Sequence, residues 1–258
     1  MPVRVVTWNV NSLKMRMPRI LQLIEQHRPD VLCLQETKAN ADAFPELELA
    51  AAGYASVHHS AGRWAGVALL ARQELALEDP VVSLPGDPMP DEARWCEATV
   101  AGMRVASVYV PNGRSPDSPE FPRKLAFLDA MAARVAELAA SGELLVAGDM
   151  NIAPADADVY DPAAFVGSTH VTAEERGRLE AMLDGGLVDA YRSLHPDEVQ
   201  YTWWDYRAGN FHKGLGLRID LALLTPGLAQ RLRACGIDRD YRKGSKPSDH
   251  APVLIDFA

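Results

Sequence analysis

Short apolar runs alternate with helix-like segments along the whole chain, and this alternation restricts the fold more than any other feature. Buried strands form continuous branched aliphatic runs, whereas helices carry an apolar stripe at helical spacing. Without a repeat or a linker, the pattern predicts a single α/β or α+β layered domain over residues 1–258. The predicted strands cover residues 3–8, 31–35, 66–71, 105–110, 144–147, 219–224 and 253–257.

Three helices are predicted from their apolar stripes and their end signals. One covers residues 17–24 with Pro18 early in it, and another covers residues 125–139. A third begins at Thr172, which forms a capping-box pattern with Glu175 ahead of an apolar face. We expect these helices to be scaffold.

Polar residues stand where the predicted strands end or begin. If these residues meet on one rim, the later strands must run opposite to the earlier ones, because one group follows its strands and the other precedes them. That arrangement requires a mixed sheet or a pair of sheets, and it excludes a parallel Rossmann or barrel fold. The residues after strands are Asn9, Glu36, Tyr109 and Asp149, and those before strands are Asp220 and His250.

The formal net charge of −9 gives little support to nucleic-acid binding, because Lys and Arg normally neutralise the phosphates. The charge is uneven, however: residues 207–246 contain nine Lys and Arg against three Asp, a local +6, which leaves −15 for the remainder. Ordinary solvated surfaces are often uneven as well. Charge alone therefore neither selects nor excludes a DNA-binding function.

Cysteine usage and apolar run lengths place the chain inside the cell. Cys33, Cys96 and Cys235 are odd in number and far apart, so they predict reduced core residues rather than disulfides or zinc ligands. The N-terminus lacks the apolar core of a signal peptide, and no later segment approaches a membrane-spanning run. We expect a cytoplasmic protein without membrane contacts.

Two carboxylates directly follow buried strands. Glu36 is a candidate magnesium ligand, since magnesium takes only one or two protein carboxylates and keeps waters and phosphate oxygens, although a strand-end Glu is also commonly just solvated. Asp149 follows a strand interrupted by Gly148, and with Asn151 it can accept a proton and orient an attacking water. An ordinary Asp/Asn turn is the alternative for this second pair.

His250, preceded by Asp249, is the histidine most suited to catalysis. A carboxylate such as Asp220 fixes the tautomer of a histidine and favours its imidazolium form, which stabilises charge on a phosphoryl group. A structural histidine is the alternative. Tyr109 could donate its hydroxyl to a phosphate oxygen, with Asn112 and Arg114 nearby, or it could be a buried core residue.

Residues 201–213 concentrate aromatic side chains among basic ones. Aromatic and basic groups in alternation suit stacking on bases or filling a gap in a duplex. A strand packed in the core would give the same pattern, so only some of these side chains need be exposed. The candidates for DNA contact are Trp203, Arg207, Phe211 and Lys213.

Taken together and in order, these segments resemble the exonuclease III family of abasic endonucleases, within the endonuclease/exonuclease/phosphatase superfamily. The resemblance extends over essentially the whole chain, and it points to the DNA-repair branch rather than the lipid or inositol phosphate branches. Each motif is weak alone, but seven in register are strong. The motifs are Thr7-Trp8-Asn9-Val10-Asn11, Leu34-Gln35-Glu36-Thr37-Lys38, Tyr109-Val110-Pro111-Asn112-Gly113, Gly148-Asp149-Met150-Asn151, Trp204-Asp205-Tyr206-Arg207, Arg218-Ile219-Asp220 and Pro247-Ser248-Asp249-His250-Ala251-Pro252-Val253.

The resemblance implies a four-layer sandwich of two mixed β-sheets flanked by helices, with the site at one end. It implies that Glu36 binds Mg²⁺, with Mn²⁺ as an alternative, and that Asn11 and Asp249 lie near the metal or its waters. Asp149, held by Asn9 and Asn151, would activate water or handle the leaving-group proton. His250 paired with Asp220, together with Tyr109 and Asn151, would contact the scissile phosphate, and the loop with Trp203 and Phe211 would probe an abasic gap from the minor groove.

The implied activity is metal-dependent hydrolysis 5′ to abasic sites in double-stranded DNA, with 3′ to 5′ exonuclease and 3′-end phosphatase activity, by a monomer associated with the nucleoid. Ser12, Asn112 and a short stretch over residues 152–170 depart from the family pattern and leave the balance of these activities open. A phosphohydrolase of the same fold acting on lipid, inositol phosphate or RNA is the second hypothesis. A catalytically inactive DNA-binding module is the third.

Overall fold

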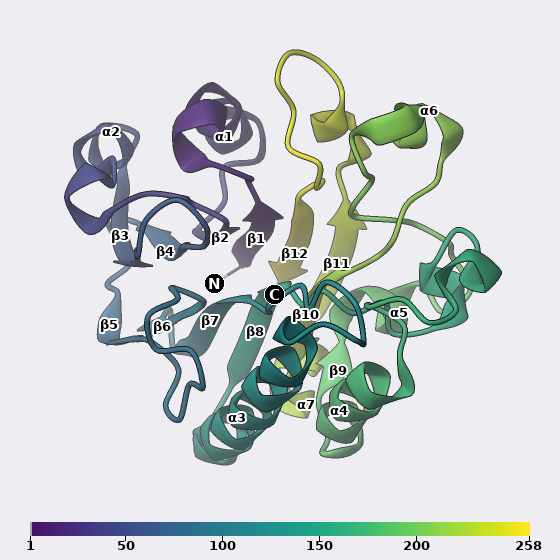
Figure 1. The fold of residues 1–258 in the computed structure, drawn as a ribbon. Coiled ribbons are helices and arrows are strands. Elements are labelled where there is room, and N and C mark those ends of the chain that lie inside the picture. The colour runs from purple at the N-terminus through teal and green to yellow at the C-terminus, as the bar shows by residue number, and fades with distance from the viewer. Residues whose placement is uncertain (1) are drawn as a thin grey trace.

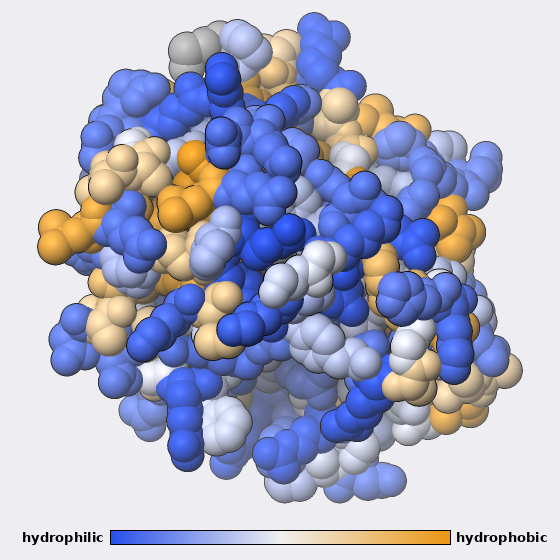
Figure 2. Space-filling model, turned by 90° about the horizontal axis from the view of Figure 1, so that it is seen from above, coloured by the Kyte–Doolittle hydropathy of each residue, from blue (hydrophilic) through white to orange (hydrophobic). Residues whose placement is uncertain are grey.

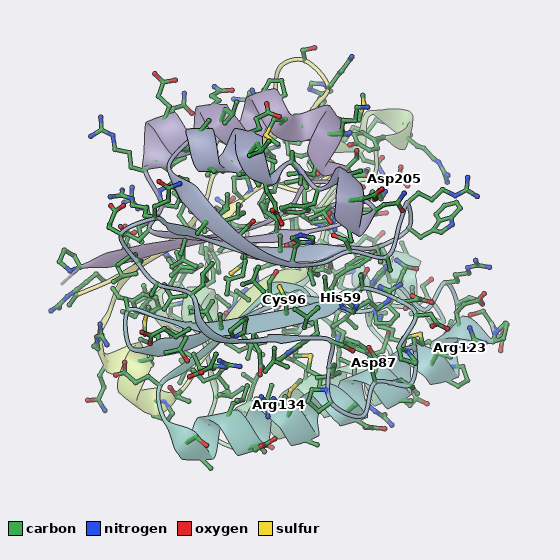
Figure 3. The ribbon with its side chains drawn as sticks, turned by 90° about the vertical axis from the view of Figure 1, so that its left-hand side faces the viewer. His59, Asp87, Cys96, Arg123, Arg134 and Asp205 are labelled. Carbon is green, nitrogen blue, oxygen red and sulfur yellow. The ribbon has the colours of Figure 1, made fainter. Side chains whose placement is uncertain are left out.

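The computed structural model describes residues 2–258, in which two six-stranded mixed sheets pack face to face with helices on their outer sides (Figure 1). This arrangement confirms the expected four-layer sandwich. The space between the sheets is filled by small and branched apolar side chains from both of them, such as Val67 and Ala147. Cys96 lies in this central layer, as Figure 3 shows, and all three cysteines are free and buried.

The first sheet has the order β11-β12-β1-β2-β4-β3. β1 and β2 are parallel, and β12 is antiparallel to β1. The helices α1 and α2 cover its outer face (Figure 1). The strands are β1 (Val3–Asn9), β2 (Val31–Gln35), β3 (Tyr54–His59), β4 (Val67–Arg72), β11 (Leu232–Ile237) and β12 (Val253–Phe257).

The second sheet has the order β5-β6-β7-β8-β10-β9. β7 and β8 are parallel, and β10 is antiparallel to β8. The helices α3 and α4 cover its outer face (Figure 1). The strands are β5 (Glu78–Val82), β6 (Trp95–Val100), β7 (Met103–Tyr109), β8 (Leu144–Asp149), β9 (Val188–Asp189) and β10 (Asp220–Leu224).

The three predicted helices exist, and the first two begin earlier than predicted, at Leu13 and Glu120. Pro18 lies inside the first helix rather than early in it, because the helix begins at Leu13 behind Ser12, whose hydroxyl accepts from the Met15 amide at 3.4 Å. The predicted capping box between Thr172 and Glu175 is confirmed at the start of the third helix. The α-helices are α1 (Leu13–His27), α2 (Glu46–Ala51), α3 (Glu120–Ser141), α4 (Ala173–Asp184), α5 (Ala190–Leu194), α6 (Asn210–Lys213) and α7 (Pro226–Gln230).

Five strands lacked a sequence signal, and the surroundings of two of them, β5 and β6, give the reason. β5 is an exposed strand at the edge of its sheet and contains Pro80, which is tolerated there because no neighbour needs its amide. β6 is buried, but Glu97 interrupts its apolar run. That carboxylate is fully buried against Arg104 and Arg134, so its charge is compensated in the core.

The strand directions bring the polar residues at the strand ends together on a single rim, and the later strands run opposite to the earlier ones as expected. β1, β2, β7 and β8 end where β10 begins, since Asp149 at the end of β8 pairs in register with Asp220 at the start of β10. The loop before β12 brings His250 to the same place, because its ring contacts Asp220. Among residues 2–258, no helix combines the length and apolar character that a membrane span requires.

Candidate active site

Asp149 stands at the centre of the rim and is almost completely buried. Its carboxylate accepts from the Asn9 amide nitrogen at 2.9 Å and from the Asn151 backbone N–H at 2.9 Å. Burial raises the pKa of Asp149 to about 7, and the charges of Asp220 and Glu36 act in the same direction against the positive charge of His250. A carboxyl with this pKa exchanges a proton readily near neutral pH.

Gly148 allows β8 to deliver Asp149 to this position. A Cβ at residue 148 would lie 2.0 Å from the carbonyl oxygen of Val108 on the neighbouring strand, and its φ of 154° belongs to the glycine region. The prediction that this glycine permits a close backbone approach is therefore confirmed.

His250 is held by a carboxylate on each side. Its Nδ1 lies 2.8 Å from Asp220 Oδ2, and its Nε2 lies 3.7 Å from Asp149 Oδ2. Burial alone would lower the pKa of His250, but the charges of Asp220 and Asp149 raise it to about 10. The ring is therefore an imidazolium at neutral pH, and it offers positive charge to an anion in the site.

A second group of oxygens lies beside Asp149 and suits a cation. Ligand atoms of Glu36, Asp149 and His250 lie within 4.8 Å of one another. His250 is a poor ligand because it is protonated and bound to Asp220, so Glu36 is the better donor. The Lys38 ammonium sits 2.8 Å from Glu36 Oε2 and 2.6 Å from Asn11 Oδ1, which shows that these two oxygens converge on positive charge.

Asp249 extends this group of oxygens. Its carboxylate accepts from the Asn11 amide at 2.9 Å and from the Trp203 indole N–H at 3.1 Å. Burial alone would raise the pKa of Asp249, but the charge of His250 and these hydrogen bonds hold it below its ordinary value. The donor set is thus carboxylate and amide oxygen, which is the set that magnesium prefers.

Tyr109 closes the rim at the end of β7. The Arg94 guanidinium lies over its ring, 4.7 Å from the centroid. Burial raises the pKa of the Tyr109 hydroxyl well above its ordinary value, and the charges of Glu36 and Asp149 add to this effect. The hydroxyl therefore stays protonated and remains a hydrogen-bond donor.

The structure adds His170 to the site, although nothing in the sequence singled it out. Its Nδ1 lies 2.6 Å from the Asn151 carbonyl, and its Nε2 lies 3.5 Å from the Asn112 side-chain nitrogen, which itself donates to Asn151 Oδ1 at 3.2 Å. Burial lowers the pKa of His170 to about 4, and the charge of Lys124 acts in the same direction. His170 is therefore neutral, in contrast to His250.

The predicted DNA-contact residues fall into two groups. Arg207, Lys213, Asn112 and Arg114 are exposed at the surface, and Arg114 forms an ion pair with Glu120 at 3.0 Å. Trp203 is half-buried and turned to Asp249.

Phe211 differs from its expected role as a probe of an abasic gap. Its side chain is only 8% exposed and meets Trp204 edge to face at 5.3 Å, with the guanidinium groups of Arg239 and Arg242 over its ring. The aromatic ring fills the base of the loop, because an apolar ring is more stable there than in water. Phe211 is therefore a core residue of the loop in this structure.

One exposed aromatic residue near the site belongs to none of the sequence motifs. Trp64 is 75% exposed, with the Arg63 guanidinium 4.8 Å from its ring. It lines a cavity of about 500 Å³ that also includes Asn112, Arg114 and Arg123.

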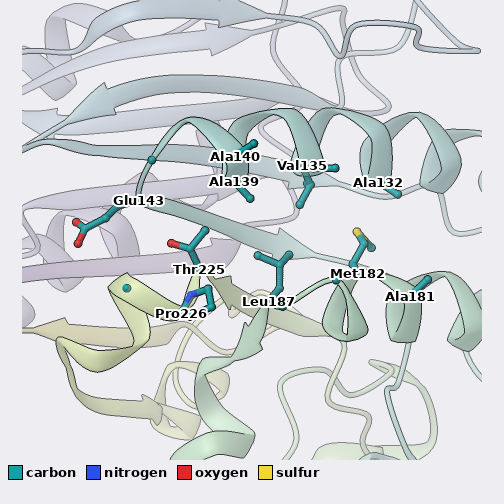
Figure 4. A pocket seen from close by; sticks show the side chains of 15 residues that line it. Ala132, Val135, Ala139, Ala140, Glu143, Ala181, Met182, Leu187, Thr225 and Pro226 are labelled. Atoms are coloured by element: carbon teal, nitrogen blue, oxygen red, sulfur yellow. The ribbon is translucent and has the colours of Figure 1, made fainter.

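A larger cavity of about 690 Å³ holds none of the predicted site residues (Figure 4). It lies between α3, α4 and the start of α7, and alanine, glycine and other apolar side chains line most of it. Glu143 is its one ionisable residue. The cavity therefore lacks groups that could carry out acid–base or metal chemistry.

Comparisons with known proteins agree with this geometry. The model of the endonuclease/exonuclease/phosphatase family matches residues 6–250. Exodeoxyribonuclease III of Haemophilus influenzae is 34% identical over 271 residues, covering 99% of this chain and 100% of that protein. The chain belongs to this family, and it is an enzyme of the exodeoxyribonuclease III type.

Two solved structures of this family superpose closely on the whole chain. A 3′ phosphatase from Neisseria, bound to a product DNA hairpin, is 39% identical with a TM-score of 0.96 and 99% coverage of both chains. An AP endonuclease from Archaeoglobus fulgidus is 34% identical with a TM-score of 0.94, again with 99% coverage of both chains. One of these relatives is thus described as a 3′ phosphatase and the other as an AP endonuclease.

Proposed function

We propose that residues 1–258 form one endonuclease/exonuclease/phosphatase domain that hydrolyses phosphate esters of DNA during base excision repair. The substrates are the phosphodiester 5′ to an abasic site, the 3′ end of a strand and a 3′ blocking phosphate. The observation that carries the proposal is the convergence of Asp149, the His250–Asp220 pair and Glu36 on one rim, in a chain similar to exodeoxyribonuclease III over its full length.

Each group on the rim has a role that follows from its surroundings. Asp149 accepts a proton from the attacking water or passes one to the leaving oxygen, and Asn9 and Asn151 orient its carboxylate. The His250 imidazolium and the Tyr109 hydroxyl stabilise negative charge on the phosphate oxygens as it develops.

Glu36, with Asn11 and Asp249 close by, would hold Mg²⁺ or, as the alternative, Mn²⁺. When bound, such an ion neutralises phosphate charge and polarises the ester. The oxygen donors fit this ion, since Lys38 already shows that Glu36 and Asn11 face a cation. Acidic residues beside DNA would repel it unless a cation intervenes.

Exposed groups on two sides of the rim would bind the DNA. Asn112 and Arg114 lie at the end of β7, and Arg207 and Lys213 lie in the loop that also supplies Trp203. Trp64 extends this surface with an aromatic face suited to stacking. Figure 2 shows that the face seen from above is largely hydrophilic, with apolar residues in separate groups. We propose a monomer in the cytoplasm, associated with the nucleoid.

The test is a panel of labelled duplexes assayed with magnesium. One carries a tetrahydrofuran abasic analogue, one a recessed 3′ end and one a 3′ phosphate at a nick. We expect hydrolysis of all three, and their relative rates give the balance of activities. Hydrolysis of an inositol phosphate or a phospholipid in preference to every duplex would replace the proposal with the phosphohydrolase hypothesis, and binding without hydrolysis would favour the DNA-binding module.

A further inference from the structure

Lys124 on α3 is a lysine whose side chain is completely buried. Its ammonium has four acceptors within hydrogen-bonding distance: the carbonyl oxygens of Asn151 at 2.7 Å and Asn112 at 3.2 Å, Thr169 Oγ1 at 3.2 Å, and the equally buried Glu175 carboxylate. An ammonium is costly to remove from water, and only complete pairing makes such a position tolerable.

Two of these acceptors belong to the loops that line the active site. Asn112 follows β7 and Asn151 follows β8, and their side chains meet at 3.2 Å in the site. Lys124 connects the two loop backbones, because its ammonium contacts a carbonyl oxygen of each. Gly113 makes room for it, because a Cβ at that position would lie 2.8 Å from Lys124 Cδ.

The other two acceptors connect the ammonium to α4. Glu175 forms the capping box of this helix with Thr172, and it also accepts from the His170 backbone N–H at 3.0 Å. His170 in turn contacts the Asn151 carbonyl through its ring. One buried cation therefore holds α3, α4 and both site loops in a fixed arrangement.

We propose that Lys124 is a positioning residue: its ammonium fixes the Asn112 and Asn151 loops, and with them the Asn151 backbone N–H that orients the Asp149 carboxylate. The inference rests on the proposed function for the identity of the substrate. It assigns the buried Lys124–Glu175 pair a role beyond stability, since a shift of about 1 Å in a group that orients substrate costs about 10²-fold in rate.

The alternative is that the pair only stabilises the fold, and Arg134 supplies the matched control. It lies on the same helix (Figure 3), its side chain is mostly buried, and it pairs with the buried carboxylate of Glu97. It contacts no residue of the rim. Lys124→Met and Arg134→Met therefore remove one inward-facing cation each from α3, near the site and away from it.

The experiment measures kcat, KM, melting temperature and backbone hydrogen exchange for both variants. For Lys124→Met we expect kcat to fall by about 10- to 100-fold while KM changes by less than about threefold, since binding contacts elsewhere remain. Exchange should accelerate in residues 110–114 and 150–153. Arg134→Met should lower the melting temperature as well, but it should leave kcat and the exchange of these loops unchanged.

If Lys124→Met does not fold, the double variant Lys124→Met/Glu175→Gln removes both buried charges and still breaks the links to Asn112 and Asn151. The same loss of kcat and the same loop exchange are expected from it. Equal kcat in either Lys124 variant and in Arg134→Met, with unchanged loop exchange, would overturn the proposal. Failure of the wild-type protein to cleave any DNA would instead overturn the proposed function, and the exchange measurement would still test the positioning of the loops.

Discussion

The rim and the segment over residues 201–213 both attracted attention as sequence motifs, but they are built in opposite ways. On the rim, Asp149, Asp220 and His250 are at most 3% exposed and bond to one another or to amides. In the segment, Arg207 and Lys213 are exposed, whereas the Phe211 ring is buried and fills the interior of the loop. The rim therefore holds its charged groups in buried, hydrogen-bonded positions, and the segment is a packed loop with a charged surface.

This difference separates chemistry from recognition. Strand ends hold reacting groups within the narrow tolerances that catalysis demands, whereas loops supply the variable contacts that select a substrate. Substitutions on the rim should therefore lower kcat, and substitutions in the segment should mainly raise KM for DNA.

Asp149→Asn should lower kcat by about 10³- to 10⁴-fold, because it removes the proton acceptor but preserves the shape of the site. The melting temperature should stay equal or rise, since the variant relieves a buried carboxylate among like charges. Single-turnover cleavage and thermal unfolding measure the two effects. Cleavage at the wild-type rate would remove Asp149 from the chemistry.

Glu36→Gln should lower kcat/KM by about 10²-fold at limiting magnesium, because a bound metal contributes several kcal/mol to such reactions. Raising the magnesium concentration should recover part of the loss. A magnesium titration of cleavage by both proteins checks this. Identical titration curves would show that the ion binds elsewhere.

Asp220→Asn should move the alkaline limit of activity to lower pH, because Asp220 helps to raise the pKa of His250 from 6.5 to about 10. A raised histidine pKa contributes stability that is fully present below about pH 6.5 and is lost as the pH rises through about 10. The variant should therefore lose more unfolding free energy at pH 6 than at pH 10. A pH profile of kcat that is superimposable on the wild type would contradict this role for the pair.

Arg207→Ala and Lys213→Ala should each raise KM for duplex DNA by only a few-fold and reduce the slope of log affinity against log salt by about 1. Neither should change kcat, because both side chains lie on the exposed surface of the loop. Binding measured at several salt concentrations tests this. A large fall in kcat would mean that the segment takes part in positioning the reacting groups.

Phe211→Leu should have the smallest effect on cleavage and a clear effect on stability. The ring packs on Trp204 at the base of the loop, so its loss should cost about 1–3 kcal/mol of unfolding free energy. KM for abasic DNA should remain unchanged when folded protein is compared. A specific rise in KM for the abasic duplex would restore the expectation that Phe211 probes the gap.

The sequence predicted the rim well because its residues are tied to strands. Asp149 and Glu36 follow recognisable buried runs, and strand direction then requires that they meet Asp220 and His250. Strand ends have little freedom, so a position in the chain translates into a position in space. The motif resemblance added the identity of the chemistry.

The residues that the sequence could not place do not lie at the ends of predicted strands. Lysine is normally a surface residue, so the sequence gives no sign that Lys124 is buried. Only the packing of the structure shows its ammonium between two loops. His170 enters the site through a loop that no periodicity describes. Phe211 and Trp64 are both aromatic residues in loops, but one is 8% exposed and the other 75%. The sequence pattern around a loop residue does not reveal this difference in exposure.

The most direct test of the account uses one labelled duplex that carries a tetrahydrofuran residue and a 3′ phosphate, incubated with wild-type protein or Asp149→Asn, in magnesium or in EDTA. We predict that the wild type in magnesium produces a cut 5′ to the analogue with a 3′ hydroxyl and releases the terminal phosphate. Both products should be absent in EDTA and strongly reduced in the variant. Equal product from all four reactions would contradict a metal-dependent site centred on Asp149.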